Sequence, residues 1–491
     1  MSSTLESSFG TCALGARSVR AWCASDGHRP QVGRGAYQIR ARSLFGCGAA
    51  ALRRRYSLGI FCVMLAFATG QASADDPVTA DVPTALRDYI TRPEKVFAWK
   101  LSTPQQFGDT KIYDIALTSQ QWQGIVWKHN LFIYEPKAMR HPGHVLLFIT
   151  GGKNGSRPGL GERAMGLKLA ELAGARVAML HQVPNQPLLD GRSEDDLITE
   201  TWLHYLKTGD KTWPLLFPMA KSAVKAMDAI EEIAKQKWDT PVKGFVVTGA
   251  SKRGWTSWLT PVVDKRVIGT APIVIDVLNF RPQMKHQLAS WGKYSEQIID
   301  YSSKGLINTG DESPREMQLR VMMDPYTYRK QLALPKLLIN GTNDRYWVVD
   351  AMNLYWDDLV GPKYVLQVPN AGHSLGDGRV SALTTVAVFF QHTAADKAMP
   401  ALSWDFGKAP DGLSLKIEPS RKPTAARLWV ARSETTDFRE SNWQPQPLAE
   451  NGKAYAMTVE RPEQGHIARY GELQFEFNGL QFSLCTLIRR D

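Results

Sequence analysis

Short β-rich runs, separated by longer segments with helical periodicity, dominate the sequence after Trp122. The run at residues 145–149 (VLLFI) is apolar throughout, which is typical of a strand covered on both faces. Residues 219–235 instead space apolar side chains three and four positions apart, as an amphipathic helix does. Strands that alternate with helices predict a mostly parallel sheet, and therefore an α/β fold. The predicted strands cover residues 129–134, 144–150, 176–181, 244–249, 270–275, 336–340 and 364–368.

Two regions depart from this alternation. Residues 279–330 have a mainly helical pattern between two predicted strands, so we expect a lid over the carboxyl edge of the sheet. After about residue 400 the chain changes to short alternating segments, which favour a small all-β, sandwich-like domain. These segments cover residues 413–417, 426–431, 454–459 and 472–487. The expected organisation is an α/β domain over residues 75–398 and a C-terminal β domain over residues 399–491.

The first 74 residues have the pattern of an export leader. Residues 53–55 are three arginines, residues 58–68 are apolar, and residues 72–74 (ASA) form a small-residue cleavage site. This arrangement predicts a cleaved secretory signal peptide over residues 51–74, with a non-cleaved anchor as the alternative. Residues 1–50 lie upstream of a complete signal, so we expect a disordered extension or a segment that is not translated. The predicted location is periplasmic or secreted.

Charge and cysteine are also concentrated in this leader. The formal net charge is +11, but residues 1–74 hold nine arginines against two acidic residues, a net +7 that leaves +4 for the remaining chain. So modest a charge gives no support to a nucleic-acid-binding surface. Four of the five cysteines also precede residue 75, so the mature chain retains Cys485 alone and cannot form an internal disulfide. We expect Cys485 to be a small buried side chain in a strand.

The strongest chemical motif is the segment FVVTGASKRG at residues 245–254. A strand, a serine between small residues and a following helix predict a nucleophile elbow, the sharp turn that projects a serine hydroxyl out of a sheet. The second glycine of the usual GxSxG pattern comes one residue late, at Gly254, with Arg253 before it. The segment predicts Ser251 as a nucleophile, with an ordinary strand-to-helix turn as the alternative.

Two later strand ends supply the partners that a serine nucleophile needs. Asp344 follows one predicted strand, and His373 lies in the loop after the next. Nucleophile, acid and histidine occur in this chain order in α/β hydrolases. We therefore predict an α/β-hydrolase fold with a helical lid, in which Ser251 attacks, His373 acts as its base and Asp344 orients the histidine. Asp276, which also ends a strand, and Asp350, which lies close to Asp344, are the rival acids.

An oxyanion requires two hydrogen-bond donors that are fixed before the reaction. The backbone amide of Lys252 follows the nucleophile directly, and Gly151 and Gly152 follow the predicted strand at residues 144–150. We predict that these residues form the oxyanion hole. For the two glycines, an ordinary turn is the alternative.

The remaining expectations concern substrate and cofactor. Asn185 and Gln186 lie in a proline-flanked loop after a strand, and we predict that they form a pocket wall with Arg253 and Trp255. A proline-stiffened loop beside an acidic helix start is the alternative. Neither a metal-ligand cluster, nor a GxGxxG fingerprint, nor a P-loop occurs in the mature sequence, so we expect no metal and no cofactor.

Six ordered blocks resemble one known family. They are FITGG at residues 148–152, VPNQP at 183–187, SEDDLITETW at 193–202, GASKRGWTSW at 249–258, GTNDRYW at 341–347 and NAGHSL at 370–375. Together they resemble the PhoPQ-activated pathogenicity-related protein family, from about Val82 to the C-terminus. The resemblance implies an α/β-hydrolase domain with an added β domain, export in Gram-negative bacteria, and an association with resistance to cationic antimicrobial peptides. It supports Ser251, Asp344 and His373 at matching positions and implies no particular substrate.

These observations predict an exported serine hydrolase, with an ester substrate favoured over a peptide. A peptidase acting on cationic peptides is one alternative, because acidic residues 194–196 would suit such substrates. A non-catalytic envelope binding protein is the other. The expected partner is a small-molecule ester, a glycan ester or a peptide. We expect no nucleic-acid partner and no stable membrane span once the signal is removed.

Overall fold

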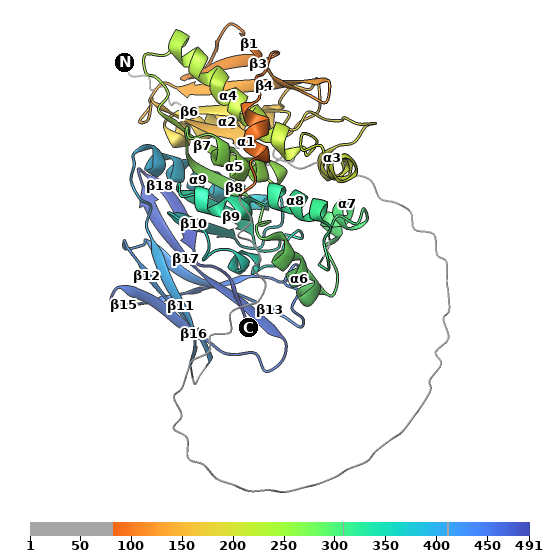
Figure 1. Ribbon diagram of the computed structural model, residues 1–491. Helices are drawn as coiled ribbons and strands as arrows, with labels where there is room; N and C mark the ends of the chain where they lie inside the picture. The colour runs from red at the N-terminus through yellow and green to blue at the C-terminus, as the bar shows by residue number, and fades with distance from the viewer. Residues whose placement is uncertain (1–81, 308, 410–411) are drawn as a thin grey trace, which may run out of the picture. The chain divides into compact units, whose positions relative to one another are not determined.

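The computed structural model describes residues 82–307, 309–409 and 412–491 (Figure 1). The predictions for residues 1–50 and 51–74 lie outside these residues. Within the described part of the chain, no helix has both the length and the apolar character that crossing a bilayer requires.

A ten-stranded mixed sheet forms the centre of the α/β domain. Its strand order is β1-β3-β4-β6-β5-β7-β8-β9-β10, with β2 also paired to β3. Pairing is antiparallel from β1 to β6 and parallel from β6 to β10. The strands are β1 (Ala98–Leu101), β2 (Gln105–Phe107), β3 (Thr110–Trp122), β4 (Ile125–Pro136), β5 (His144–Ile149), β6 (Arg176–Leu180), β7 (Gly244–Ala250), β8 (Val267–Ile273), β9 (Lys336–Gly341) and β10 (Lys363–Val368).

This sheet confirms the predicted α/β-hydrolase fold, because it is parallel from β6 onward and inverts the order of β5 and β6 as that fold does. All the predicted strands of the sheet are present. Sequence reasoning missed β1, β2 and β3, since polar residues interrupt the apolar pattern of β3. Ser119 and Gln120 are nevertheless fully buried there, and the Gln120 amide donates to the Pro218 carbonyl 2.7 Å away. The periodicity of apolar residues in the sequence does not indicate tertiary hydrogen bonds of this kind.

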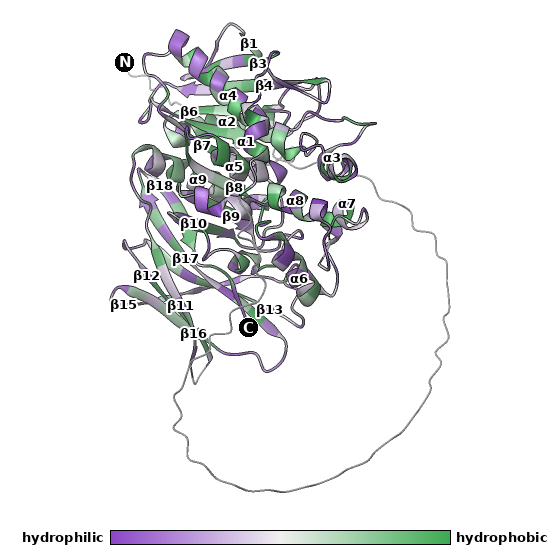
Figure 2. Ribbon diagram, in the orientation of Figure 1, coloured by the Kyte–Doolittle hydropathy of each residue, from purple (hydrophilic) through white to green (hydrophobic). Residues whose placement is uncertain are grey.

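Helices pack against the sheet in two groups. Helix α2 (Leu160–Ala173) packs against α9 (Arg379–Ala394), while α4 (Leu216–Lys237) packs against α1 (Ala85–Thr91) and α5 (Lys252–Val263). The predicted helix at residues 219–235 lies within α4, whose hydrophobic and hydrophilic residues alternate along the ribbon in Figure 2. Because β5 and β6 are buried almost throughout, their apolar runs are covered on both faces.

The segment predicted as a lid is a helical insertion between β8 and β9. It contains α6 (Phe280–Trp291), η1 (Glu296–Ile298), α7 (Ile299–Ser302), α8 (Pro314–Met323) and η2 (Pro325–Gln331). Its two ends are joined by Asp324, whose buried carboxylate accepts the backbone amides of Asn279 at 3.1 Å and Phe280 at 2.8 Å. Ser313 is the N-cap residue of helix α8 and forms a capping box with Glu316.

The C-terminal region consists of two antiparallel sheets, in the orders β11-β12-β16-β15 and β14-β13-β17-β18, with β19 paired to β17. The strands are β11 (Leu402–Ala409), β12 (Gly412–Pro419), β13 (Ala425–Ser433), β14 (Gln444–Pro447), β15 (Ala449–Asn451), β16 (Ala454–Val459), β17 (His466–Phe477), β18 (Leu480–Cys485) and β19 (Arg489–Arg490). The sheets meet closely at Gly471, where an added Cβ would lie 2.1 Å from the Ile417 side chain. The all-β character of the region is as predicted.

The segment at residues 472–487 falls mostly within a hairpin. Its strands, β17 and β18, are joined by Asn478 and Gly479. Both turn residues have positive φ, 51° and 75°, which is the type I′ geometry that an Asn-Gly pair favours. Cys485 is buried in β18, which confirms the expectation for that residue.

Candidate active site

Ser251 occupies a strained turn between β7 and α5. Its backbone has φ 58° and ψ −129°, outside the conformations that a non-glycine residue normally adopts. A Cβ at Gly249 would lie 2.8 Å from the Arg253 carbonyl oxygen. A Cβ at Gly254 would lie 2.6 Å from the Ile275 side chain and 3.0 Å from the Gly249 carbonyl oxygen. The close approach therefore falls on residue 254, not 253, which explains why the second glycine comes one residue late.

The three predicted triad residues lie together at the ends of β7, β9 and β10. His373 Nε2 is 2.9 Å from Ser251 Oγ, and His373 Nδ1 is 2.8 Å from Asp344 Oδ2. The other carboxylate oxygen of Asp344 accepts the backbone amide of Tyr346 at 3.0 Å. Asp344 is buried and His373 is partly buried, so the carboxylate lies behind an imidazole that faces the serine. This is the geometry of a nucleophile, a base and an orienting acid.

The rival acids occupy other positions. Asp276 accepts a hydrogen bond from the Tyr355 hydroxyl, and burial raises the pKa of Asp276 to about 7. Asp350 accepts from His286 Nε2 at 2.6 Å and pairs with Arg490 at 3.3 Å. Of the three candidate acids, Asp344 is therefore the one that is hydrogen-bonded to His373.

The residues predicted as the oxyanion hole lie around the same turn. Lys252 is the first residue of α5, where backbone amides have no acceptor within the helix. Gly151 and Gly152 follow β5, which is paired directly with β7. Gly152 has φ 127°, which favours glycine, whereas a Cβ at Gly151 would lie 2.4 Å from the Arg253 guanidinium and would require that side chain to shift. Their role as donors to an oxyanion remains a prediction.

Three of the four residues predicted to contact substrate lie outside the cavity beside Ser251. The Asn185 amide is bound to the backbone of Lys128, at 2.8 Å and 2.9 Å. Gln186 accepts the Glu194 amide at 2.9 Å. The Arg253 guanidinium donates to the Val183 carbonyl at 2.6 Å and pairs with Glu194 at 2.7 Å. Asn185 thus binds the loop after β6 to β4, Gln186 binds it to the start of α3, and Arg253 binds it to the elbow.

Trp255 does line the cavity, as predicted. It packs edge to face against Trp202 and Phe280, with ring centroids 6.0 Å and 5.5 Å away, and its indole donates to the Met323 carbonyl at 2.8 Å. The wall of the cavity is thus tied to the lid.

The acidic residues at the start of α3 (Glu194–Thr208) are all paired. Glu194 contacts the Lys252 ammonium at 2.8 Å and also binds Arg253. Asp195 contacts the same ammonium at 3.1 Å and accepts the Tyr301 hydroxyl at 3.0 Å. Burial raises the pKa of the Glu194 carboxyl, but the two neighbouring cations outweigh this effect and hold it well below 4.5.

The third acid of this group, Asp196, is paired with Arg192 at 2.8 Å and with Lys304 at 2.5 Å. Since Lys304 belongs to the lid insertion, this pair and the Tyr301 hydrogen bond both fasten the lid to α3. The acidic helix start is therefore mainly a structural anchor.

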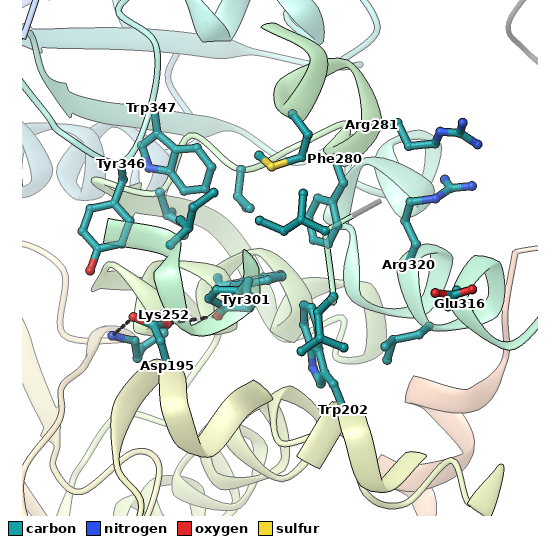
Figure 3. Close-up of a pocket in the computed structure, with 18 of the residues that line it drawn as sticks. Asp195, Trp202, Lys252, Phe280, Arg281, Tyr301, Glu316, Arg320, Tyr346 and Trp347 are labelled. Carbon is teal, nitrogen blue, oxygen red and sulfur yellow. Dashed lines mark hydrogen bonds and ion pairs between the residues drawn. The ribbon is translucent and has the colours of Figure 1, made fainter. Parts of the chain in front are cut away.

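Sequence reasoning did not single out most of the residues that line the cavity. Figure 3 shows Tyr346, Lys252 and Asp195 on one side of it and Arg281, Arg320 and Glu316 on the other, with Trp202, Phe280 and Tyr301 between them. The Tyr346 ring lies 4.2 Å from the His373 ring, centroid to centroid. The helical pattern of residues 279–330 predicted a lid, but it did not indicate which face of the lid meets the nucleophile.

Within the described residues, no group of three or more His, Cys, Asp or Glu side chains is arranged to hold a metal ion.

Two comparisons of sequence identify relatives of this chain. The model of the PhoPQ-activated pathogenicity-related protein family matches residues 86–439. The chain is 30% identical over 427 residues to autocrine proliferation repressor protein A of Dictyostelium discoideum, covering 80% of this chain and 86% of that protein.

Solved structures with a similar arrangement include two esterases. An acetyl xylan esterase from a Paenibacillus species is 13% identical, with a TM-score of 0.42, covering 62% of this chain and 91% of that one. A glucuronoyl esterase from Solibacter usitatus is 12% identical, with a TM-score of 0.38, covering 64% and 92%. Likenesses at these scores do not bear on the substrate of this chain.

Proposed function

Because the chain belongs to the PhoPQ-activated pathogenicity-related protein family and carries a Ser-His-Asp arrangement, we propose that it is a serine hydrolase that cleaves a carboxylic ester. The observation that carries this proposal is the 2.9 Å contact of His373 Nε2 with a serine hydroxyl held at φ 58°. An activated serine nucleophile needs a hydrogen bond to its base and a turn that exposes its hydroxyl, and Ser251 has both.

The reaction proceeds in two halves. Ser251 Oγ attacks the ester carbonyl carbon while His373 Nε2 takes the hydroxyl proton, and Asp344 stabilises the resulting imidazolium. The tetrahedral oxyanion is bound by the backbone amide of Lys252 and by an amide of Gly151 or Gly152. The imidazolium then gives its proton to the departing alcohol, which leaves an acyl ester on Ser251. A water molecule, deprotonated by His373, hydrolyses that ester and restores the serine.

Peptidase action on cationic peptides is the second candidate, but the charge distribution gives it less support. The acids at residues 194–196 were the feature that suited cationic substrates. Each of them is bound to lysine or arginine side chains of the chain itself, so little negative charge remains for a ligand. A glycan ester is compatible with the chemistry, and a purely binding role is the third candidate.

Fluorophosphonate labelling tests the enzyme proposal directly. We expect covalent modification of the wild-type protein at Ser251, and none in Ser251→Ala or in heat-denatured protein. A wild-type protein that stays unlabelled as fully as the alanine variant would leave only the binding role. Ester and cationic-peptide panels then separate esterase from peptidase, since an esterase releases alcohol from esters while the peptides remain intact.

The proposed location is the periplasm or the medium, on the strength of the leader at residues 51–74. N-terminal sequencing of the protein from a fractionated host is expected to begin at Asp75. A cytoplasmic protein that retains residues 53–55 would contradict export.

A further inference from the structure

The cavity beside Ser251 suggests what kind of ester the enzyme takes. Resting on the proposed function, we infer that the acyl group of the substrate is an uncharged hydrocarbon, aromatic or of medium length, that fills this cavity. Most of the residues that line the cavity are apolar, and several belong to the lid. The apolar lining consists of Trp202, Leu206, Trp255, Ile275, Val277, Phe280, Met284, Ile298, Leu306, Ile307, Leu319 and Trp347.

The charged side chains of the lining are already bound to partners. Arg320 Nε contacts Glu312 Oε1 at 2.9 Å, and Arg281 contacts the same carboxylate at 3.5 Å. Glu316 accepts the Ser313 amide at 2.7 Å. On the other side, Asp195 and Lys252 pair with each other. A charged or heavily hydroxylated acyl group would therefore have to break existing pairs, whereas a hydrocarbon only needs the apolar surface.

The size of the cavity agrees with a chain of several carbon atoms. Its volume is about 120 Å³, which leaves room for several water molecules. Because transfer of a methylene group from water into an apolar site is worth about 0.8 kcal/mol, each added methylene is expected to raise kcat/KM about fourfold until the cavity is filled.

The test compares p-nitrophenyl acetate, butyrate and hexanoate. We expect kcat/KM to rise on the order of a hundredfold from acetate to hexanoate. Met284→Lys places a charge in the cavity wall, and Met317→Lys makes the same change at a lid residue that is 45% exposed and does not line the cavity. We expect Met284→Lys to remove most of the hexanoate advantage, measured as the ratio of kcat/KM for hexanoate to kcat/KM for acetate, and Met317→Lys to keep the wild-type ratio.

Fluorophosphonate labelling keeps the two failures apart. An unlabelled wild-type protein contradicts the esterase proposal itself. A labelled protein that prefers acetate to hexanoate, or whose hexanoate preference survives Met284→Lys, overturns the inference about the acyl group.

A separate set of contacts concerns how the triad is held in place. We propose that Asn343 and Asn370 are positioning residues, through which the C-terminal β domain holds the acid and histidine loops. Asn343 directly precedes Asp344, and its amide donates to the carbonyls of Arg439 at 3.1 Å and Ser441 at 2.7 Å. Asn370, three residues before His373, donates to the Trp443 carbonyl at 2.9 Å and accepts the Trp443 amide at 2.7 Å.

The two loops are also bound to each other. The backbone N–H of Asn343 donates to the Ala371 carbonyl at 2.9 Å, and the backbone N–H of Asn370 donates to the Thr342 hydroxyl at 3.0 Å. The segment at residues 439–443 therefore supports both loops as one unit. Catalytic geometry is sensitive to such support, since a misplacement of about 1 Å can cost on the order of a hundredfold in rate.

Asn353 provides a matched control. Its amide also joins the two domains, by donating to the Ile488 carbonyl at 2.9 Å, but it does not lie in a triad loop. The variants are Asn343→Ala, Asn370→Gly, which suits the positive φ of 54° at that residue, and Asn353→Ala.

We expect kcat to fall about tenfold to a hundredfold in the first two variants, with KM within about threefold and slower fluorophosphonate labelling. Asn353→Ala should lower Tm about as much as Asn343→Ala and Asn370→Gly do, but its kcat should stay at the wild-type value. Equal kcat in all three variants, measured well below their Tm, would show that the asparagines only stabilise the domain interface and would overturn the proposal.

Discussion

The serine turn and the two loops that face it are built in different ways. The turn at Ser251 is shaped by its own sequence, because Gly249 and Gly254 allow α5 to approach β7 and β8 more closely than any side chain would permit. The loops at Asp344 and His373 are instead bound from outside, by the segment at residues 439–443. The nucleophile is therefore a local feature of the strand-to-helix turn, whereas its partners depend on a segment between β13 and β14.

Removing the nucleophile tests the site as a whole and has the largest expected effect. Ser251→Ala is expected to lower kcat for a p-nitrophenyl ester by about 10⁴-fold or more, since the hydroxyl that forms the acyl-enzyme is lost. Tm should change little, because the substitution removes only the hydroxyl oxygen and no group that packs in the core. Ester hydrolysis that persists at more than a hundredth of the wild-type rate would contradict the assignment of Ser251.

Removing the acid tests the side of the site that residues 439–443 support. Asp344→Asn is expected to lower kcat about 10³-fold to 10⁴-fold, because an amide cannot stabilise the imidazolium at His373. Asp276→Asn is the control. Because Asp276 is hydrogen-bonded to Tyr355 and not to His373, this variant should keep kcat within a few-fold of wild type. If the two variants exchanged these outcomes, the rival acid would be the functional one.

Much of this site was predictable from the sequence because its main features are local. A strand, a serine and a helix within ten residues identify an elbow, and an aspartate and a histidine after later strands complete the chain order. The same reasoning placed Arg253 in the pocket, since proximity in sequence to the nucleophile does not reveal that its guanidinium turns back to Glu194.

What the sequence did not reveal depends on contacts between distant segments. Asn343 and Asn370 belong to ordinary loop motifs. Nothing in the neighbouring sequence indicates that their side chains bind the backbone of Ser441 and Trp443, which lie far along the chain. The apolar face of the lid was equally hidden, because an amphipathic pattern shows that one face is buried without showing against what.

Substitutions at two glycines compare the crowded turn at Ser251 with the more open loop at His373. Gly254→Ala is expected to destabilise the protein by about 1–3 kcal/mol and to lower activity, because its Cβ would lie 2.6 Å from Ile275 and close to two carbonyl oxygens. Gly372→Ala, beside His373, would place its Cβ at an ordinary 3.6 Å from the Asn343 carbonyl oxygen and should be tolerated. Thermal unfolding and ester hydrolysis measure both effects. Equal losses in the two variants would mean that the turn is no more constrained than the loop.

The smallest expected effect distinguishes the two rival acids by the pH dependence of stability. Burial raises the pKa of Asp276 to about 7, against 3.8 for a free aspartate, so the folded protein keeps a proton that the unfolded chain has lost. Stability therefore falls as pH rises from 3.8 to 7 through this group. Asp276→Asn removes that loss, and its Tm relative to wild type should be a few degrees higher at pH 8 than at pH 5.

Asp350 should behave in the opposite way. Burial raises the pKa of its carboxyl, but His286 and Arg490 outweigh burial and hold the pKa below 3.8. Its ionised form thus contributes stability above pH 3.8 that is lost as pH falls through the lower, folded-state pKa. Asp350→Asn should accordingly destabilise the protein at pH 7 and progressively less as the pH is lowered below 3.8. Parallel pH profiles for the two variants would contradict the opposite environments that the structure gives these carboxylates.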